Sequence, residues 1–166
     1  MTHFKPARNK QDYKAISDLA KEIWTEHYTP IIGIDQVNYM LEKFQSKKAI
    51  KSQILDDNYQ YFSLINNNTF LGYLSIKKEE DKLFLSKIYI MKSFRGQGFG
   101  KISMDFIETQ AKDLNCSKIY LTVNKHNINS INAYKKIGFI KIEELIIDIG
   151  NGYVMDDYKM EKILIN

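Results

Sequence analysis

The stretch Arg95-Gly96-Gln97-Gly98-Phe99-Gly100-Lys101 combines residue types and spacing that suit anion binding. An apolar and aromatic run over residues 83–90 precedes it and predicts a buried strand. Apolar residues follow it at helical spacing: Met104, Ile107, Ala111 and Leu114. A glycine turn between a strand and a helix lets backbone N–H groups converge on an anion at the positive end of the helix. The stretch therefore predicts a phosphate- or pyrophosphate-binding turn.

Spacing separates three known kinds of glycine-rich turn. In a nucleoside-triphosphate loop the first glycine would fall at Arg95, and Ile102 would replace the hydroxyl residue that holds magnesium. In a dinucleotide fingerprint the third glycine would fall at Lys101. The remaining pattern, [Q/R]-x-x-G-x-[G/A], is satisfied by Arg95, Gly98 and Gly100.

A second pattern lies one expected helix and one expected strand further on. Residues 118–123 alternate and are rich in strand-forming residues, so they predict the next strand. The segment after them matches N-x-x-[A/S]-x-x-x-Y-x-K-x-G-F through Asn127, Ser130, Tyr134, Lys136, Gly138 and Phe139. In this order and spacing, the two patterns resemble the two signatures of the GNAT superfamily of acyl-CoA-dependent N-acyltransferases.

The resemblance implies a fold and a cosubstrate. The fold is α/β: a single N-acetyltransferase domain over residues 1–166, with a mixed central sheet and helices on both faces. Its fourth and fifth strands run parallel and splay apart, and the cofactor enters the gap. The cosubstrate implied is acetyl-CoA.

The resemblance also assigns residues to the cofactor. The backbone of residues 88–90 would pair with the pantetheine arm, and the N–H groups of residues 97–101 would hold the pyrophosphate. The residues that it assigns to cofactor binding are Ile88, Tyr89, Ile90, Arg95, Gly96, Gln97, Gly98, Phe99, Gly100, Lys101, Asn127, Ser130, Tyr134 and Lys136.

Acetyl transfer to an amine needs a proton donor for the departing thiolate and a neutral nitrogen. Tyr134 matches the family tyrosine that serves as general acid. A phenol of pKa about 10 protonates a thiolate whose thiol has pKa about 8.5 at a cost of only about 2 kcal/mol. The base is less clearly marked, because Ser86 and Lys87 stand where many relatives carry a carboxylate or histidine. Glu26 and His27 are the candidates for that role.

The acceptor pocket in this superfamily is built by the first two helices and the last strands. Aromatic and acidic residues that could line it are Trp24, Tyr28, Tyr153, Tyr158, Asp148, Asp156 and Asp157. A primary amine of a small molecule, polyamine-like or other, is the leading acceptor. A protein or peptide amine is the alternative within the enzyme class. A non-catalytic acyl-CoA-binding sensor is the alternative outside it.

Bulk properties narrow the class of protein. The 166 residues carry a net charge of +4 and are 44% hydrophobic, as in one ordinary globular domain. The spread charge does not indicate a nucleic-acid binder, and the sequence contains neither a membrane-spanning run nor a signal peptide. We therefore expect a cytoplasmic protein. Scattered histidines predict no metal site, and Cys116 is expected to be a small packed residue. The oligomeric state stays open, a homodimer included.

Periodicity gives the remaining elements. A helix is expected over residues 13–24 with Asp12 as its cap, followed by a turn over 29–33. Asp35 is the expected cap of a second helix with Val37, Met40, Leu41 and Phe44 inward, and a short helix is expected around residues 49–54. Residues 59–65 and 69–76 predict a β-hairpin, and two strands are expected at 140–149 and 157–164.

Overall fold

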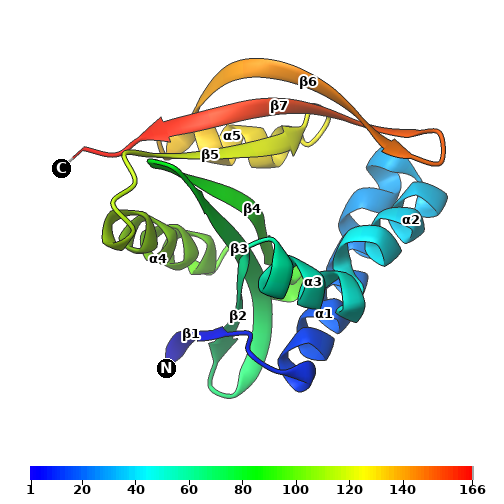
Figure 1. Ribbon diagram of the computed structural model, residues 1–166, viewed down its shortest axis with the longest axis horizontal. Coiled ribbons are helices and arrows are strands. Elements are labelled where there is room, and N and C mark those ends of the chain that lie inside the picture. The colour runs from blue at the N-terminus through cyan, green and yellow to red at the C-terminus, as the bar shows by residue number, and fades with distance from the viewer. Residues whose placement is uncertain (166) are drawn as a thin grey trace. The chain divides into compact units, whose positions relative to one another are not determined.

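The computed structural model describes residues 1–165; residue 166, the last of the expected domain, lies outside the described part. Figure 1 shows the mixed α/β arrangement. The strands are β1 (Thr2–Pro6), β2 (Gln60–Asn66), β3 (Thr69–Glu79), β4 (Lys82–Ile90), β5 (Lys118–Asn124), β6 (Ile140–Gly150) and β7 (Tyr153–Ile163). The helices are α1 (Lys10–Ile32), α2 (Ile34–Gln45), α3 (Lys47–Asp56), α4 (Phe99–Asp113) and α5 (Ile128–Lys136), with a 3₁₀ turn η1 (Lys92–Phe94).

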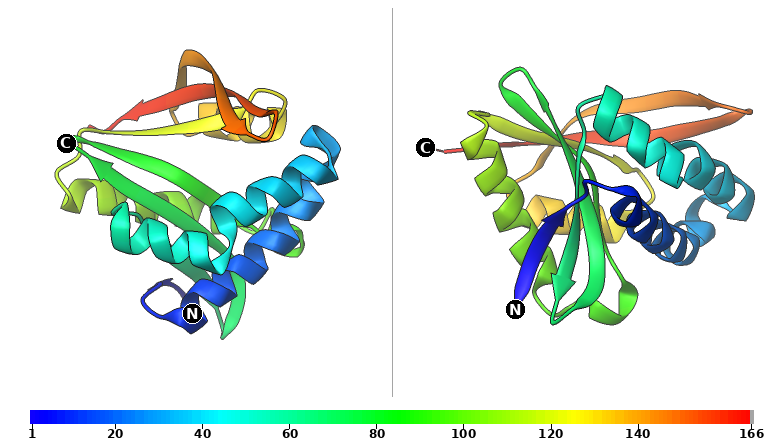
Figure 2. Two further views of the ribbon diagram at one scale, coloured as in Figure 1. Left: turned by 45° about the vertical axis from the view of Figure 1, so that its right-hand side comes forward. Right: turned by 60° about the horizontal axis from the view of Figure 1, so that its bottom comes forward.

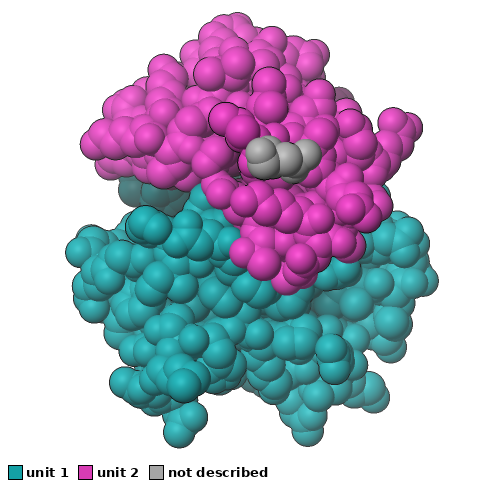
Figure 3. All heavy atoms as spheres, turned by 90° about the vertical axis from the view of Figure 1, so that its left-hand side faces the viewer, with its two compact units in different colours: residues 1–77, 86–107 teal, residues 78–85, 108–166 magenta. Residues whose placement is uncertain are grey.

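The strands form one sheet in the order β1-β2-β3-β4-β5-β7-β6. The chain divides into two compact units, coloured separately in Figure 3. Unit 1 holds residues 1–77 and 86–107, and unit 2 holds residues 78–85 and those from 108 onward. The unit boundaries therefore cross β3, β4 and α4.

Helices cover both faces of the sheet in unit 1, as expected. Phe106 of α4 stacks on Phe4 at 4.1 Å between ring centroids and meets Phe62 edge-on at 5.1 Å. Tyr61 is the neighbour of Phe62 along β2, and because side chains alternate along a strand it points to the other face. There its hydroxyl accepts a hydrogen bond from Gln45 of α2. The right-hand view in Figure 2 shows strands between α4 and the group formed by α1, α2 and α3.

Unit 2 contains the parallel part of the sheet. β4 and β5 pair in parallel from Lys82 with Lys118 to Phe84 with Tyr120, although β4 continues to Ile90 and β5 to Asn124. β7 pairs antiparallel with both β5 and β6. Side chains buried in this unit include Leu83, Leu85, Cys116, Ile119, Leu121, Val123 and Ile131. The expected packing of Cys116 just before β5 is confirmed.

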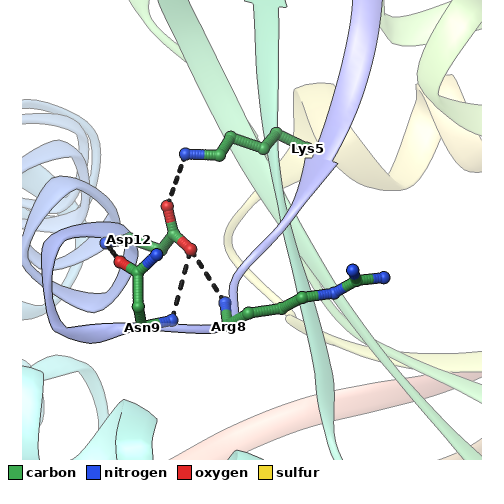
Figure 4. A network of polar contacts seen from close by, with 4 residues as sticks. All are labelled: Lys5, Arg8, Asn9 and Asp12. Atoms are coloured by element: carbon green, nitrogen blue, oxygen red, sulfur yellow. Dashed lines mark hydrogen bonds and ion pairs between the residues drawn. The ribbon is translucent and has the colours of Figure 1, made fainter.

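The start of α1 corrects the expected cap. Asn9, not Asp12, is the N-cap: its side chain accepts the N–H of Asp12 at 3.0 Å. Asp12 is the third residue of the helix and accepts the N–H groups of Arg8 at 2.8 Å and Asn9 at 3.3 Å (Figure 4). Lys5 adds an ion pair at 2.6 Å. Burial alone would raise the pKa of Asp12, but the hydrogen bonds and charge of Lys5 and the two backbone donors bring it below its ordinary value.

Other boundaries also differ from expectation. β1 was not expected, and it exists because it pairs antiparallel with β2, a contact distant in sequence. α1 runs through Pro30 to Ile32, where a turn was expected. Gly33 precedes α2, so Asp35 lies in the first turn and is not its cap. Val37 and Met40 are buried as expected, whereas Leu41, Phe44 and Leu114 are only half-buried. β7 begins at Tyr153, before the expected residue 157.

Gly72 allows β4 to lie unusually close to β3. A Cβ atom at this position would lie 2.0 Å from the carbonyl oxygen of Tyr89 and 3.0 Å from the Cα of Ile90. Both clashing atoms belong to backbone, which cannot rotate away as the end of a side chain could. Gly72 therefore sets the path of β4 through Tyr89.

The Asp12 capping network predicts a pH-dependent contribution to stability. Asp12→Ala should lower the free energy of unfolding at pH 7 by about 1–2 kcal/mol, since it removes the capping bonds. The folded pKa lies below the unfolded value of about 3.9, so this contribution is complete above the unfolded pKa and is lost as pH falls through the folded pKa. Urea unfolding at pH 7 and pH 3 measures it. Asp18→Ala, which breaks only the exposed pair with Lys14, is the control and should cost under about 0.5 kcal/mol. A deficit as large at pH 3 as at pH 7 would contradict the assignment.

The close approach at Gly72 predicts a strong steric effect. Gly72→Ala should lower the free energy of unfolding by about 1–3 kcal/mol or more, because the β3 and β4 backbones must move apart. Gly100→Ala is the matched control, since its nearest neighbour for an added Cβ is the Ile90 side chain at 3.9 Å. Thermal unfolding of both variants provides the comparison. Equal midpoints would refute the role given to Gly72.

Candidate functional site

The glycine turn has the backbone that its sequence requires. Gly96 and Gly98 have φ values of +74° and +87°, in the left-handed region that disfavours other residues. The carbonyl of Gly98 accepts the N–H of Ile102 at 3.1 Å, so α4 starts directly after Gly98. The N–H groups in the first turn of a helix have no partner within that helix and carry its positive dipole end.

Two side chains fasten this turn to the segment before it. Arg95 donates its Nε–H to the carbonyl of Ile90 at 2.9 Å. Gln97 donates from Nε2 to the carbonyl of Ser93 at 3.1 Å. These bonds fix the turn relative to the end of β4.

The space around the turn fits a phosphate group. A Cβ atom added at Gly96 or at Gly98 would have no heavy atom within 4 Å, apart from the adjoining chain. Lys101 is exposed and forms an ion pair with Asp105 at 2.8 Å, so its ammonium already has a carboxylate partner. The backbone of the turn, more than the lysine, is therefore the feature suited to an anion.

The expected base candidates lie on α1 in unit 1. Glu26 is exposed, and its carboxylate lies 3.6 Å from the ammonium of Lys92, just after β4. The His27 ring meets the Tyr28 ring edge-on at 4.8 Å. Trp24 is only 3% exposed and belongs to the core of this unit. Glu26, His27 and Tyr28 are consecutive residues of α1, and the buried Trp24 ring packs edge-on against the Tyr28 ring at 5.4 Å.

A buried chain of hydrogen bonds begins at Trp24 and was not predicted from the sequence. The indole of Trp24 donates to the Tyr73 hydroxyl at 3.0 Å, and Tyr73 donates to Gln45 Oε1 at 2.6 Å. Gln45 donates to the Tyr61 hydroxyl at 3.1 Å, and Tyr61 donates to Gln53 Oε1 at 2.5 Å. Burial raises the pKa of Tyr61 to about 12 and that of Tyr73 well above 10, so both phenols keep their protons. The chain links three helices to two strands.

The second signature is placed on α5 in unit 2. Asn127 immediately precedes the helix, is 5% exposed, and accepts the N–H of Ile131 at its carbonyl at 3.1 Å. Ser130 and Tyr134 follow at intervals of three and four residues, so these three residues share one face of the helix. Ser130 and Tyr134 are half-buried, and Lys136 is exposed.

The end of α5 explains the last part of the signature. Gly138 has φ +103°, its N–H donates to Lys135, and the N–H of Phe139 donates to the carbonyl of Tyr134 at 3.0 Å. This is the Schellman ending of a helix. Its usual apolar contact is present too, because the Phe139 ring packs edge-on against the Tyr134 ring at 5.7 Å. Gly138 and Phe139 therefore end the helix and hold the ring of Tyr134.

The expected acceptor residues of unit 2 do not form one acidic cluster. Asp148 accepts the N–H of Gly150 at 2.7 Å in the β6–β7 turn. Asp156 forms a hydrogen-bonded ion pair with Lys125, and this hydrogen bond raises the pKa of Lys125. Asp157 is 5% exposed, and Tyr153 is half-buried. Asp148 thus caps a turn, Asp156 is paired with a lysine, and Asp157 is buried.

Residues 1–165 contain neither a cluster of metal ligands nor a membrane-spanning helix. Within these residues, no group of three or more histidine, cysteine, aspartate or glutamate side chains is placed to hold a metal ion. In the same range, every helix is too short or too polar to cross a membrane.

Comparison with known proteins assigns the family. A model of the acetyltransferase (GNAT) family matches residues 14–139. The chain belongs to this family and is an acetyl-CoA-dependent N-acetyltransferase. It superposes on the PaiA N-acetyltransferase of Thermoplasma acidophilum, solved with coenzyme A, with TM-score 0.81 and 18% identity, over 99% of each chain. The expected fold is confirmed.

Sequence relatives differ in the acceptor their names give. An uncharacterized N-acetyltransferase in the pepI 3′ region of Lactobacillus delbrueckii subsp. lactis is 21% identical over 95% of both chains. A ribosomal protein bS18 alanine N-acetyltransferase of Haemophilus influenzae is 29% identical over 52% of this chain and 59% of its own. A probable spermine N(1)-acetyltransferase of Bacillus subtilis subsp. natto is 32% identical over 35% of this chain and 39% of its own. The family is thus fixed and the acceptor is not.

The turn predicts a graded response to substitution. Gly98→Ala should weaken coenzyme A binding at least about 10-fold, because a side chain is strained at φ +87° and fills the space beside the turn. Gly100→Ala should bind nearly as well as the wild type, since its φ is not in the strained region. Isothermal titration with coenzyme A measures both. Equal affinity for the two variants would refute this turn as the binding site.

Proposed function

We propose that the protein acetylates a primary amine of a small cationic molecule, of the polyamine type. Binding of acetyl-CoA is supported by the open, left-handed turn at Gly96 and Gly98. A cationic amine as the acceptor is supported by the carboxylate of Glu26 on the same helix as the aromatic residues Trp24 and Tyr28. The partial likeness to a probable spermine acetyltransferase also favours it.

Acetyl-CoA supplies an activated acetyl thioester when bound. The N–H groups of residues 97–101 would hold its pyrophosphate, and Arg95 would add charge through the part of its guanidinium that does not bind Ile90. The backbone of Ile88, Tyr89 and Ile90 would hold the pantetheine arm. Phe99 belongs to this turn as the first residue of α4. Asn127, Ser130 and Lys136 are the proposed contacts from unit 2.

Tyr134 is the proposed general acid for the thiolate sulfur. The proposal is supported by the packing of its ring on Phe139 and by the backbone hydrogen bonds at the ending of α5. A positioned acid adds about 10²–10⁴-fold to a rate.

The base must remove a proton from the acceptor. An aliphatic ammonium of pKa about 10.4 is under about 0.1% neutral at pH 7. We propose that Glu26 or His27 takes this proton, directly or through water. The exposed Glu26 carboxylate already lies 3.6 Å from the Lys92 ammonium, and we propose that the acceptor amine would approach the same carboxylate.

The acceptor is proposed to lie against Tyr28 and Tyr153, with Trp24 acting through its buried packing on the Tyr28 ring. Asp148, Asp156 and Asp157 would add negative potential, with Asp156 already paired to Lys125. A protein N-terminal amine is the second candidate, favoured by the match to the bS18 alanine enzyme.

Tyr134→Phe tests the proposed chemistry. The variant keeps the ring that packs on Phe139 and loses the proton, so kcat for spermidine should fall about 100-fold with acetyl-CoA affinity unchanged. Release of coenzyme A measures turnover. Tyr120→Phe, whose hydroxyl donates to Glu79 in the same unit, is the control and should keep kcat within about twofold. Full activity in Tyr134→Phe would remove the general-acid role. Acetyl-CoA binding without transfer to spermidine or to an alanine-terminated peptide would favour the sensor.

A further inference from the structure

Two tyrosine hydroxyls meet at the end of β4 in unit 1. The Oη atoms of Tyr28 on α1 and Tyr89 on β4 lie 3.1 Å apart, within hydrogen-bond distance. Both side chains are half-buried. Only the backbone of Tyr89 was expected to take part in binding, so its side chain has a contact that the cofactor role does not explain.

The pair is suited to an amine. When two phenols share a hydrogen bond, one donates and both oxygens keep acceptor capacity for another N–H. A phenol ring also attracts an ammonium to its face. Glu26 lies two residues before Tyr28 on α1, and its carboxylate is already paired with the Lys92 ammonium at 3.6 Å. The two phenol oxygens and the two ring faces together suit a primary amine on an aliphatic chain.

The pair is also held rigidly. The Trp24 ring contacts the Tyr28 ring at 5.4 Å and the Tyr89 ring at 5.6 Å, edge-on in both cases. Tyr73 lies 5.5 Å from the Tyr89 ring and holds Trp24 by its hydroxyl. The backbone of Tyr89 is set by its contact with Gly72. A contact fixed before the ligand arrives loses less freedom on binding.

We infer that the Tyr28–Tyr89 hydroxyl pair binds the acceptor amine and that the Tyr89 side chain determines acceptor specificity. The inference rests on the proposed amine acetylation. It assigns to Tyr89 a second role: its backbone serves the cofactor and its hydroxyl serves the acceptor.

Trp24 provides a readout that does not depend on turnover. It is the only tryptophan of the sequence, and its ring touches both tyrosines. Its fluorescence should therefore change when spermidine or an alanine-terminated peptide is titrated in without acetyl-CoA. Tyr28→Phe and Tyr89→Phe keep the ring contacts and remove one hydroxyl each. Tyr39→Phe, whose hydroxyl is contacted by Lys43 on α2, is the matched control.

Each single variant should raise the dissociation constant and the KM of the amine about 10-fold, as expected for one lost hydrogen bond to a charged group. The KM of acetyl-CoA should stay within about twofold, and Tyr39→Phe should behave as the wild type. Because the hydroxyls act as a pair, the double variant should be less impaired than the product of the singles.

The outcomes separate this inference from the proposed function. Unchanged amine KM and unchanged fluorescence titration in both folded singles would overturn the inference while leaving acetylation intact. Amine binding that is lost in the variants, with no turnover in the wild type, would support the pair and count against the proposed function. Absence of any fluorescence response and of any turnover with both probes would overturn the inference. Thermal midpoints of the variants establish that each is folded.

Discussion

The close approach of β3 and β4 at Gly72 is the constraint on which unit 1 depends. Because no side chain fits there, the backbone of β4 lies against β3 at Tyr89. That position brings the Tyr89 hydroxyl to Tyr28 and the Tyr89 ring to Tyr73. It also determines where the backbone proposed to hold the pantetheine arm lies. The absence of a side chain at Gly72 thus determines the position of both the proposed cofactor-binding strand and the proposed acceptor contact.

Both sequence signatures owe much of their pattern to helix boundaries. Gly98 adopts a left-handed conformation and precedes α4, which leaves the first N–H groups of that helix for an anion. Gly138 adopts a similar conformation and ends α5, and Phe139 then packs on Tyr134. The glycines are therefore required by backbone geometry. Tyr134 is the residue of the second signature whose proposed role is chemical.

Local patterns predicted the elements whose signals are local. The hairpin of β2 and β3, helix α4 and strand β5 follow from periodicity and turn residues, and the structure confirms them. β1 was not predicted because it is formed by pairing with β2, which is distant in sequence. Asn9 and Asp12 share a capping box, and composition alone did not say which one is the cap. The hydrogen bonds of Gln45 and of the Tyr89 hydroxyl were not predicted for the same reason, since their partners belong to other elements.

Pro30 has a consequence for the mobility of α1. Proline has no N–H, so the carbonyl of Glu26, four residues earlier, lacks its regular helical donor. The N–H of Gly33 still closes the helix on Thr29 at 3.0 Å. The final turn of α1 is therefore held by fewer bonds than the turns before it and opens at lower cost. This turn directly follows His27 and Tyr28, so the junction with α2 has fewer helical hydrogen bonds to hold it than the capped start of α1 has.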